Sequence, residues 1–324
     1  MGNLKTSKGD KRTRSQAAGL ITPAIIGIGV ALGCTLAWPL MAFQSMNLYA
    51  GLPHYEGILD QAYLLSIIAT TVTLALCGIF HKQFDRLLGS VPARYLFPTG
   101  LAICTLLVLG GGEEGTVGMV LVTAYGIGTG VFSALFLMNF GAVLGVLSLK
   151  QSAAAIAIGY LASTVLFFAF LFFGRFESVL FCASMGPVAA AFLFYGVSSL
   201  QIDKKQVNAL PRQADPEDPA EHRQLIHLIC ALGSTMLVCG VSYELSRTLY
   251  VQMGQFASSD VTPYAIAQGG ITTLTAIGSI GVALVLITSK GVRGPEACYR
   301  LITTFLLVGA LLLPAPMLVP NIPA

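Results

Sequence analysis

Residues 200–224, LQIDKKQVNALPRQADPEDPAEHRQ, divide the chain into two apolar parts of unequal length. This stretch holds three prolines and five acidic residues, and almost nothing in it could be buried. The residues before it, 19–199, are mostly apolar, and the apolar pattern starts again after it. We therefore interpret 200–224 as a solvated linker between a larger membrane-embedded part, 19–199, and a smaller one, 225–324.

Composition supports membrane embedding. Hydrophobic residues make up 55% of the chain and charged residues 10%, whereas ordinary soluble domains carry about 25% charged residues. The apolar runs are about 18 to 25 residues long, which is the length that a helix needs to cross about 30 Å of hydrocarbon. The predicted fold class is all-α, a polytopic bundle of membrane helices.

Nine apolar runs are long enough to be predicted as spans. They cover residues 19–43, 62–80, 95–110, 117–138, 152–173, 178–199, 225–243, 263–288 and 301–320. If the N-terminus lies inside, sixteen of the eighteen lysines and arginines fall on the cytoplasmic side, and only Arg175 and Arg247 fall outside. The distribution predicts a multi-pass protein of the cell membrane, with a basic cytoplasmic tail (1–18) and a cytoplasmic linker.

Three short matches relate the part before the linker to the part after it. Residues 31–36, ALGCTL, are similar to 231–236, ALGSTM, and residues 70–73, TTVT, are similar to 272–275, TTLT. Arg94 opens the third predicted span as Arg300 opens the ninth. The matches occur in the same order, about 200 residues apart. We interpret them as the duplication of a six-span unit, of which three spans of the second copy are present.

A six-span unit that is repeated in parallel and joined by a cytoplasmic linker resembles the plan of the major facilitator superfamily. The loop after the second span, GIFHKQFDRLLG at 78–89, keeps the acidic–basic pair of the family's loop as Asp85 and Arg86. It lacks that loop's spacing and its trailing basic pair. The resemblance implies that Asp85 and Arg86 belong to a loop that holds the two halves together.

A second resemblance involves the short basic N-terminus, Trp38 in the first span, and the glycine-rich fourth span that runs into Asn139-Phe140-Gly141. These features are similar to the membrane region of actinobacterial (Eggerthella-type) regulators with a LuxR-type helix-turn-helix. That resemblance implies a ligand-sensing bundle of twelve spans followed by a DNA-binding domain. No helix-turn-helix is present in this sequence, so we expect a truncated membrane region that does not itself bind nucleic acid.

Uncharged polar residues are the candidate ligand contacts. The facilitator resemblance implies that spans one and seven line a central cavity, with spans five and eight beside them. It therefore implies that a small, weakly charged ligand is bound by polar side chains of these spans, namely Thr35, Trp38, Tyr160, Thr235 and Gln268. Hydrogen bonding between helices is the alternative role, and it is favoured for any one of them taken alone.

Glu244, near the outer end of span seven, is the main ionisable residue within the predicted spans. It could bind a proton or a cation at the outer mouth, or it could pair with Arg247 three residues further along the same helix face. We favour the pair. The four histidines are scattered over loops and span ends and have no metal-ligand spacing, so no metal or other cofactor is expected.

Glycines in the fourth span have a packing interpretation. Tyr125-Gly126-Ile127-Gly128-Thr129-Gly130 follows no strand and is not a nucleotide loop, and Gly141 with Gly145 has the Gly-x-x-x-Gly spacing. In both places we predict close approach between helices.

The sequence contains no nucleophile–base pair and no phosphate loop, so an enzyme is not expected. Two functions remain. The favoured one is the ligand-sensing membrane region of a LuxR-type regulator, and the alternative is a secondary transporter of a small neutral or apolar solute.

Overall fold

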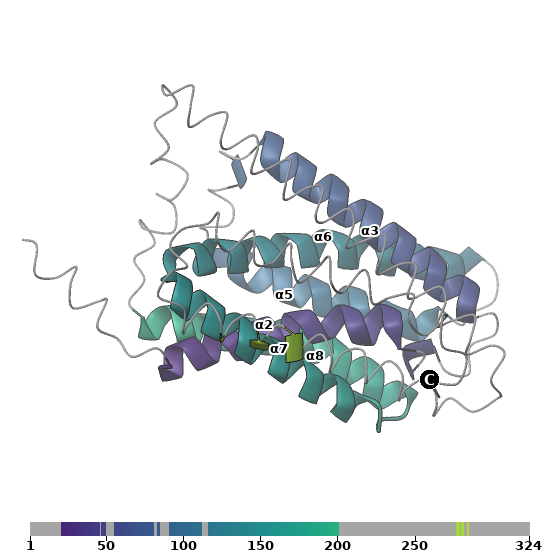
Figure 1. Ribbon diagram of the computed structural model, residues 1–324. Coiled ribbons are helices and arrows are strands. Elements are labelled where there is room, and N and C mark those ends of the chain that lie inside the picture. The colour runs from purple at the N-terminus through teal and green to yellow at the C-terminus, as the bar shows by residue number, and fades with distance from the viewer. Residues whose placement is uncertain are drawn as a thin grey trace, which may run out of the picture.

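The computed structural model describes residues 21–45, 47–49, 55–80, 83–84, 91–111 and 116–200, together with 277–278, 280–281 and 284. The N-terminal tail, the linker and nearly all of the last three predicted spans lie outside the described residues. The described part is all-helical, as predicted, and six of its helices are long and apolar enough to cross a membrane (Figure 1). Each of the first six predicted spans coincides with one of these helices, which supports a multi-pass membrane protein.

The first span is α2 (Pro23–Pro39), which the π-helix η1 (Leu40–Gln44) continues. A short 3-10 helix, η2 (Asn47–Tyr49), precedes α3 (Tyr55–Ile79). The third span is α5 (Val91–Leu106) with the 3-10 helix η3 (Leu107–Gly110). The last three are α6 (Thr116–Val146), α7 (Leu149–Phe170) and α8 (Arg175–Ser199).

Most helices begin or end a few residues away from the predicted bounds, and α3 begins at Tyr55 rather than at residue 62. Helix α6 continues to Val146, beyond the predicted end at residue 138. Helix α7 begins at Leu149 rather than at residue 152, because Ser148 and Gln151 form a capping box. The Gln151 N–H donates to Ser148 Oγ over 3.4 Å, and the Ser148 N–H donates to Gln151 Oε1 over 3.2 Å. These local bonds start the helix before the apolar run begins.

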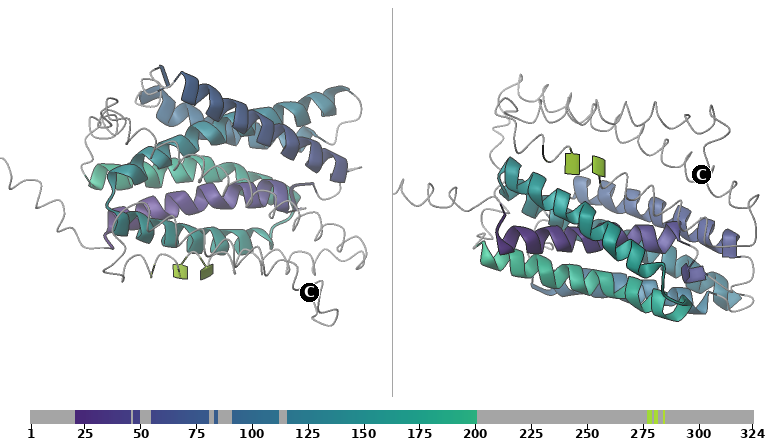
Figure 2. Two further views of the ribbon diagram at one scale, coloured as in Figure 1. Left: turned by 45° about the horizontal axis from the view of Figure 1, so that its top comes forward. Right: turned by 60° about the horizontal axis from the view of Figure 1, so that its bottom comes forward.

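Successive helices run in opposite directions, so one end of the bundle contains the starts of α2, α5 and α7. We call it the Pro23 end, and the opposite one the Gln44 end. Helix α2 packs between α7 and α8, helix α6 packs against α3 and α5, and contact between α5 and α8 joins the two groups (Figure 2). Among the six described spans, α2 is the most enclosed: 67% of its most apolar window is buried, compared with 28% for the span in α3.

This pairing is symmetric between the first three and the last three helices. Exchanging α2, α3 and α5 for α6, α7 and α8 converts the α2–α7 contact into the α6–α3 contact. The same exchange converts α2–α8 into α6–α5 and leaves α5–α8 unchanged. Helices alternate in direction and each of these two sets of consecutive helices contains three. Therefore α6, α7 and α8 run opposite to their counterparts α2, α3 and α5.

Glycines set the α2–α7 contact. A β-carbon placed on Gly29 would lie 2.7 Å from Ile158 Cβ, and one placed on Gly33 would lie 2.6 Å from Ala162 Cβ. Real β-carbons essentially never come so close to their neighbours, so these two positions require glycine at this helix separation. Gly29 and Gly33 form a Gly-x-x-x-Gly pair, the spacing that places two small residues on one face of a membrane helix.

The α6–α3 contact repeats this arrangement residue for residue. A β-carbon on Gly126 would lie 2.9 Å from Leu65 Cβ, and one on Gly130 would lie 2.8 Å from Ala69 Cβ. The two α6 glycines each follow their α2 counterparts by 97 residues, and the two α3 contacts each precede their α7 counterparts by 93 residues. The close approach predicted for Gly126–Gly130 is therefore confirmed, and it belongs to an internal repeat of three helices.

The close approach predicted for Gly141 is not observed. Among the described residues, nothing lies within 4 Å of a β-carbon built on Gly141. The Gly-x-x-x-Gly spacing alone did not identify the packed face, because that face is determined by the rotation of α6 against α3, which the spacing does not encode.

Candidate functional site

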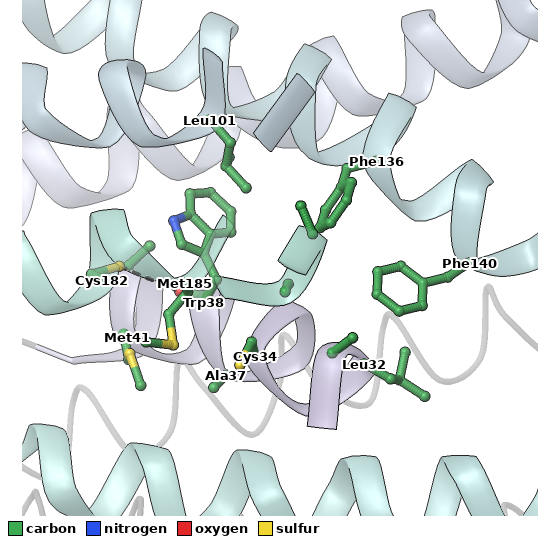
Figure 3. Packing of buried hydrophobic residues seen from close by; sticks show 14 of the residues in the cluster. Leu32, Cys34, Ala37, Trp38, Met41, Leu101, Phe136, Phe140, Cys182 and Met185 are labelled. Atoms are coloured by element: carbon green, nitrogen blue, oxygen red, sulfur yellow. Dashed lines mark hydrogen bonds between the residues drawn. The ribbon is translucent and has the colours of Figure 1, made fainter. Parts of the chain in front are cut away.

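Trp38 lies at the junction of α2, α5 and α8 and is only 3% exposed. Its indole Nε1–H donates to Thr105 Oγ1 on α5 over 3.0 Å, and the Thr105 hydroxyl donates to the Leu101 carbonyl over 2.8 Å. On the other side, the Cys182 thiol of α8 donates to the Trp38 carbonyl over 3.9 Å (Figure 3). The indole therefore makes the hydrogen bond between helices that was the alternative to ligand contact.

The end of α2 changes its helical form beside Trp38. Pro39 has no N–H, so the carbonyl one turn before it loses its usual partner, and the chain continues as the π-helix η1. Carbonyls in the last turn of a helix have no partner within the helix. At this end, two tyrosine hydroxyls from other segments supply partners.

Tyr49 and Tyr125 both bind the Ala42 carbonyl, the first over 2.8 Å and the second over 3.4 Å. Their two hydroxyl oxygens are 3.2 Å apart, and both side chains are fully buried. The ring of Phe43 packs beside them, with its centroid 5.8 Å from that of Tyr125 and 5.5 Å from that of Tyr63. This tyrosine pair joins η1 to η2 and to α6.

We expect the two tyrosine hydroxyls to substitute for each other. In Tyr49→Phe, the Tyr125 hydroxyl can still donate to the Ala42 carbonyl, and the reverse holds for Tyr125→Phe. Each single change should therefore reduce the free energy of unfolding by about 0.5–1 kcal/mol, and the double change by more than the sum of the two, since only then is the buried carbonyl left without either hydroxyl. Unfolding in detergent micelles measures this, and Tyr95→Phe, at a side chain that is 63% exposed, is the neutral control. Strict additivity would contradict the shared carbonyl.

The connecting segments at the Gln44 end are joined to one another. Arg175 in the first turn of α8 donates from Nε to the Leu48 carbonyl over 3.3 Å and from Nη2 to the Leu109 carbonyl over 3.5 Å. Asn47 Nδ2 donates to the Phe170 carbonyl over 3.3 Å at the end of α7. These three bonds link η2, which follows the first span, to the ends of the third and fifth spans and to the start of α8.

Arg175→Gln should loosen this end of the bundle. It removes the fork that reaches two carbonyls at once, and Arg175→Lys can restore no more than one of the two bonds. We expect amide hydrogen exchange at Leu48 and Tyr49 to become faster, roughly tenfold for a loss of about 1.4 kcal/mol. Lys150→Gln, at the Pro23 end, should leave that exchange unchanged. Unchanged exchange in Arg175→Gln would mean that the two long bonds contribute nothing.

Of the predicted ligand residues, Thr35 and Tyr160 are half-buried on the adjacent helices α2 and α7. The Thr35 hydroxyl donates to the Ala31 carbonyl of its own helix over 3.0 Å. The contacts of Gly33 with Gly159 and Ala162 place Tyr160 beside Gly33 in depth, and Thr35 is two residues, or about 3 Å, further along α2. The structure therefore brings these two residues to nearly the same depth, and Trp38 lies one turn beyond them.

The other predicted site residues lie outside the described residues. They are Thr235, Gln268 and Glu244, together with the loop residues Asp85 and Arg86. Their roles stay predictions.

The described residues offer hydrogen bonds and aromatic faces rather than charge. No group of three histidine, cysteine, aspartate or glutamate side chains in the described part of the chain could hold a metal ion. Every buried side-chain nitrogen or oxygen there has a hydrogen-bond partner. Polar groups that could meet a ligand are therefore the half-exposed ones, such as Thr35 and Tyr160.

Comparison of the chain with protein-family models, with curated proteins and with solved structures finds no match.

Sequence reasoning missed the tyrosine pair and the residues that join the connecting segments. Tyr49 and Asn47 lie between predicted spans, where only loop residues were expected. Tyr125 directly precedes Gly126 in the fourth span, and this segment was interpreted only as a glycine packing face, without a role for the tyrosine hydroxyl. Arg175 carried a usable signal, because it is one of two basic residues on the side that the sequence predicts to be poor in positive charge.

Proposed function

We propose that this chain is a facilitator-like membrane protein whose six-helix part forms one side of a site for a small neutral ligand. The observation that carries the proposal is the internal repeat: two groups of three helices pack with the same pairing, and their contact residues correspond at constant offsets. Inverted groups of three helices are the building units of each facilitator half. The nine spans, the cytoplasmic N-terminus and the second half are parts of the proposal.

The chemistry of the spans supports a neutral ligand. No charged residue occurs in 23–43, 61–80, 95–111, 116–146, 151–174 or 178–199. A charged solute inside a bundle requires a partner of opposite sign or a water-filled cavity. The half-exposed Thr35 and Tyr160, within about one helical turn of each other in depth on α2 and α7, offer hydroxyl groups beside apolar surface. Such a surface suits a small ligand with one or two hydrogen-bonding groups.

We further propose that the bundle senses this ligand rather than transporting it, as the membrane region of a transcriptional regulator. The departure of the 78–89 loop from the facilitator pattern supports this choice, because that loop holds the two halves together in transporters. The inverted repeat equally supports a transporter, which is the second candidate, since rocking of two such halves moves solutes across membranes.

Trp38 provides a test without added labels, because it is the only tryptophan of the chain. The protein is reconstituted in liposomes and exposed to a panel of neutral amino acids, sugars and nucleosides. A change in Trp38 emission without solute uptake supports a sensor, whereas uptake supports a transporter. If a complete twelve-span version of the protein shows neither a change in emission nor uptake for any solute of the panel, the sensor and the transporter proposals both lose support. A helix-turn-helix in the reading frame beyond codon 324 would favour the sensor.

Orientation is tested by labelling single cysteines in a cysteine-free background. Ala214→Cys, within the linker, should be protected from a membrane-impermeant maleimide in intact cells. Phe172→Cys, at a side chain that is 87% exposed between α7 and α8, should be labelled. The opposite pattern would reverse the proposed orientation and leave the helical repeat intact.

A further inference from the structure

Arg94 occupies an unusual position at the Pro23 end of the bundle. It lies in the first turns of α5, and its guanidinium carbon is 5.7 Å from the ring centroid of Phe194, near the end of α8. That distance is within the range of a cation–π interaction. The ring of Tyr95 is 5.9 Å from the same phenylalanine ring, and the Tyr95 side chain is 63% exposed. The contact between α5 and α8 therefore presents a positive charge next to two aromatic rings.

The depth of this group matches a membrane interface. Arg94 is three residues into α5 and Phe194 is five residues from the end of α8, so both lie about 5–8 Å inside the helix ends. Tyrosine is enriched at this level of a bilayer, and arginine reaches it by extending its side chain toward the headgroups.

Charge at this end is all of one sign within the described residues. The charged side chains there are Arg94 and Lys150, whereas Asp60 and Glu177 belong to the Gln44 end. Among the described residues no ion pair accounts for Arg94, and its guanidinium packs against the Phe194 ring, which does not use up its N–H donors. Five N–H donors in a planar fork match the oxygens of a phosphate group.

We propose that Arg94, with Tyr95 and Phe194, binds the phosphate of an anionic phospholipid at the α5–α8 contact. The acyl chains would lie along the exposed apolar side chains of α5, such as Leu96 and Ile103. The proposed orientation assigns this lipid to the cytoplasmic leaflet, which carries anionic headgroups. The inference rests on the proposed function for the choice of leaflet only.

The test measures thermal stabilisation of the delipidated protein by phosphatidylglycerol and by phosphatidylcholine with the same acyl chains. Phosphatidylglycerol should stabilise the wild type more than phosphatidylcholine does. Arg94→Gln should weaken phosphatidylglycerol binding about fivefold, which corresponds to the contribution of one basic residue near a membrane surface. Phe194→Leu keeps the charge but removes the ring that holds it, and it should weaken binding by a smaller factor.

Lys150→Gln is the matched control, because Lys150 is a basic residue at the same end without an aromatic partner in the described structure. Equal losses in Arg94→Gln and Lys150→Gln would mean diffuse attraction and would overturn the site. Stabilisation by inorganic phosphate alone would assign the group to a free anion and would also overturn the proposal. If Arg94→Gln does not fold, Phe194→Leu and Arg94→Lys provide the test. A preference for phosphatidylglycerol equal to that of the wild type in both variants would overturn the proposed lipid site. None of these results bears on the cysteine-labelling pattern, so the proposed orientation fails or holds separately.

Discussion

Gly33→Leu and Gly130→Leu should each destabilise the protein by about 3 kcal/mol or more. The added side chain begins with a β-carbon that would lie 2.6 Å from Ala162 Cβ in α7 or 2.8 Å from Ala69 Cβ in α3. Backbone carbonyls of Gly159 and Ser66 lie equally near, and a carbonyl cannot move aside as a flexible side chain can. The helices must therefore separate, and overpacking of this kind costs about 1–3 kcal/mol even where side chains can adjust. Thermal unfolding in detergent micelles measures the loss.

Two glycines of the same helices serve as controls. Nothing described lies within 4 Å of a β-carbon on Gly141 in α6 or on Gly78 in α3. Leucine is also a better helix former than glycine. Gly141→Leu and Gly78→Leu should therefore change the free energy of unfolding by no more than about 0.5 kcal/mol. If Gly130→Leu is tolerated as well as Gly141→Leu, the close approach of α6 and α3 is wrong, and the repeat loses its main support.

Trp38→Ala should destabilise the protein to a similar extent, with an expected loss of about 3–5 kcal/mol. The indole is buried between three helices, and its removal leaves a cavity together with an unpaired Thr105 hydroxyl oxygen. Thr105→Val separates the polar contribution from the packing contribution. It should cost about 1 kcal/mol, the size of a hydrogen bond between membrane helices.

A double-mutant cycle between Trp38→Phe and Thr105→Val tests that hydrogen bond directly. Once the indole N–H is absent, loss of the threonine hydroxyl should cost less than it does in the wild type. Thr123→Val is the control, because its hydroxyl donates to the Met119 carbonyl within its own helix. If Trp38→Phe and Thr105→Val have additive effects on the free energy of unfolding, the indole N–H does not donate a stabilising hydrogen bond to Thr105. A Trp38→Phe protein that folds normally and loses the ligand response would instead favour the role in ligand binding.

The six described helices could be predicted from sequence because each crossing needs a long, uncharged apolar run. Only the ends were misplaced, and the reason is local. Helix α6 passes the single polar residue Asn139 and continues through the apolar residues 140–146. Helix α7 includes Lys150 and Gln151 before its apolar run, because a helix can leave hydrocarbon without ending. The Ser-x-x-Gln pattern of Ser148 and Gln151 is a sequence signature of a helix N-terminus and could have predicted this start.

The pairing of helices and the partners of polar groups could not be predicted in the same way. The choice between ligand contact and hydrogen bonding for Trp38 depends on where Thr105 lies, 67 residues away. The close approach at Gly126 and Gly130 was predicted correctly, but the same spacing at Gly141 and Gly145 wrongly predicted a second packed face. Rotation and separation of helices determine both outcomes, and these depend on all six spans together.

The enclosed position of α2 has a consequence for how the protein is made. Its partners α7 and α8 begin at Leu149 and Arg175, so about 110 residues are synthesised after α2 ends before the first partner starts. During that interval the glycine face of α2 is exposed to lipid or contacts an insertion factor. Because α2 contains no charged residue, its exposure to lipid costs little. If translation terminates after α6, helix α2 lacks both of its partners, α7 and α8, and becomes a target for quality-control proteolysis.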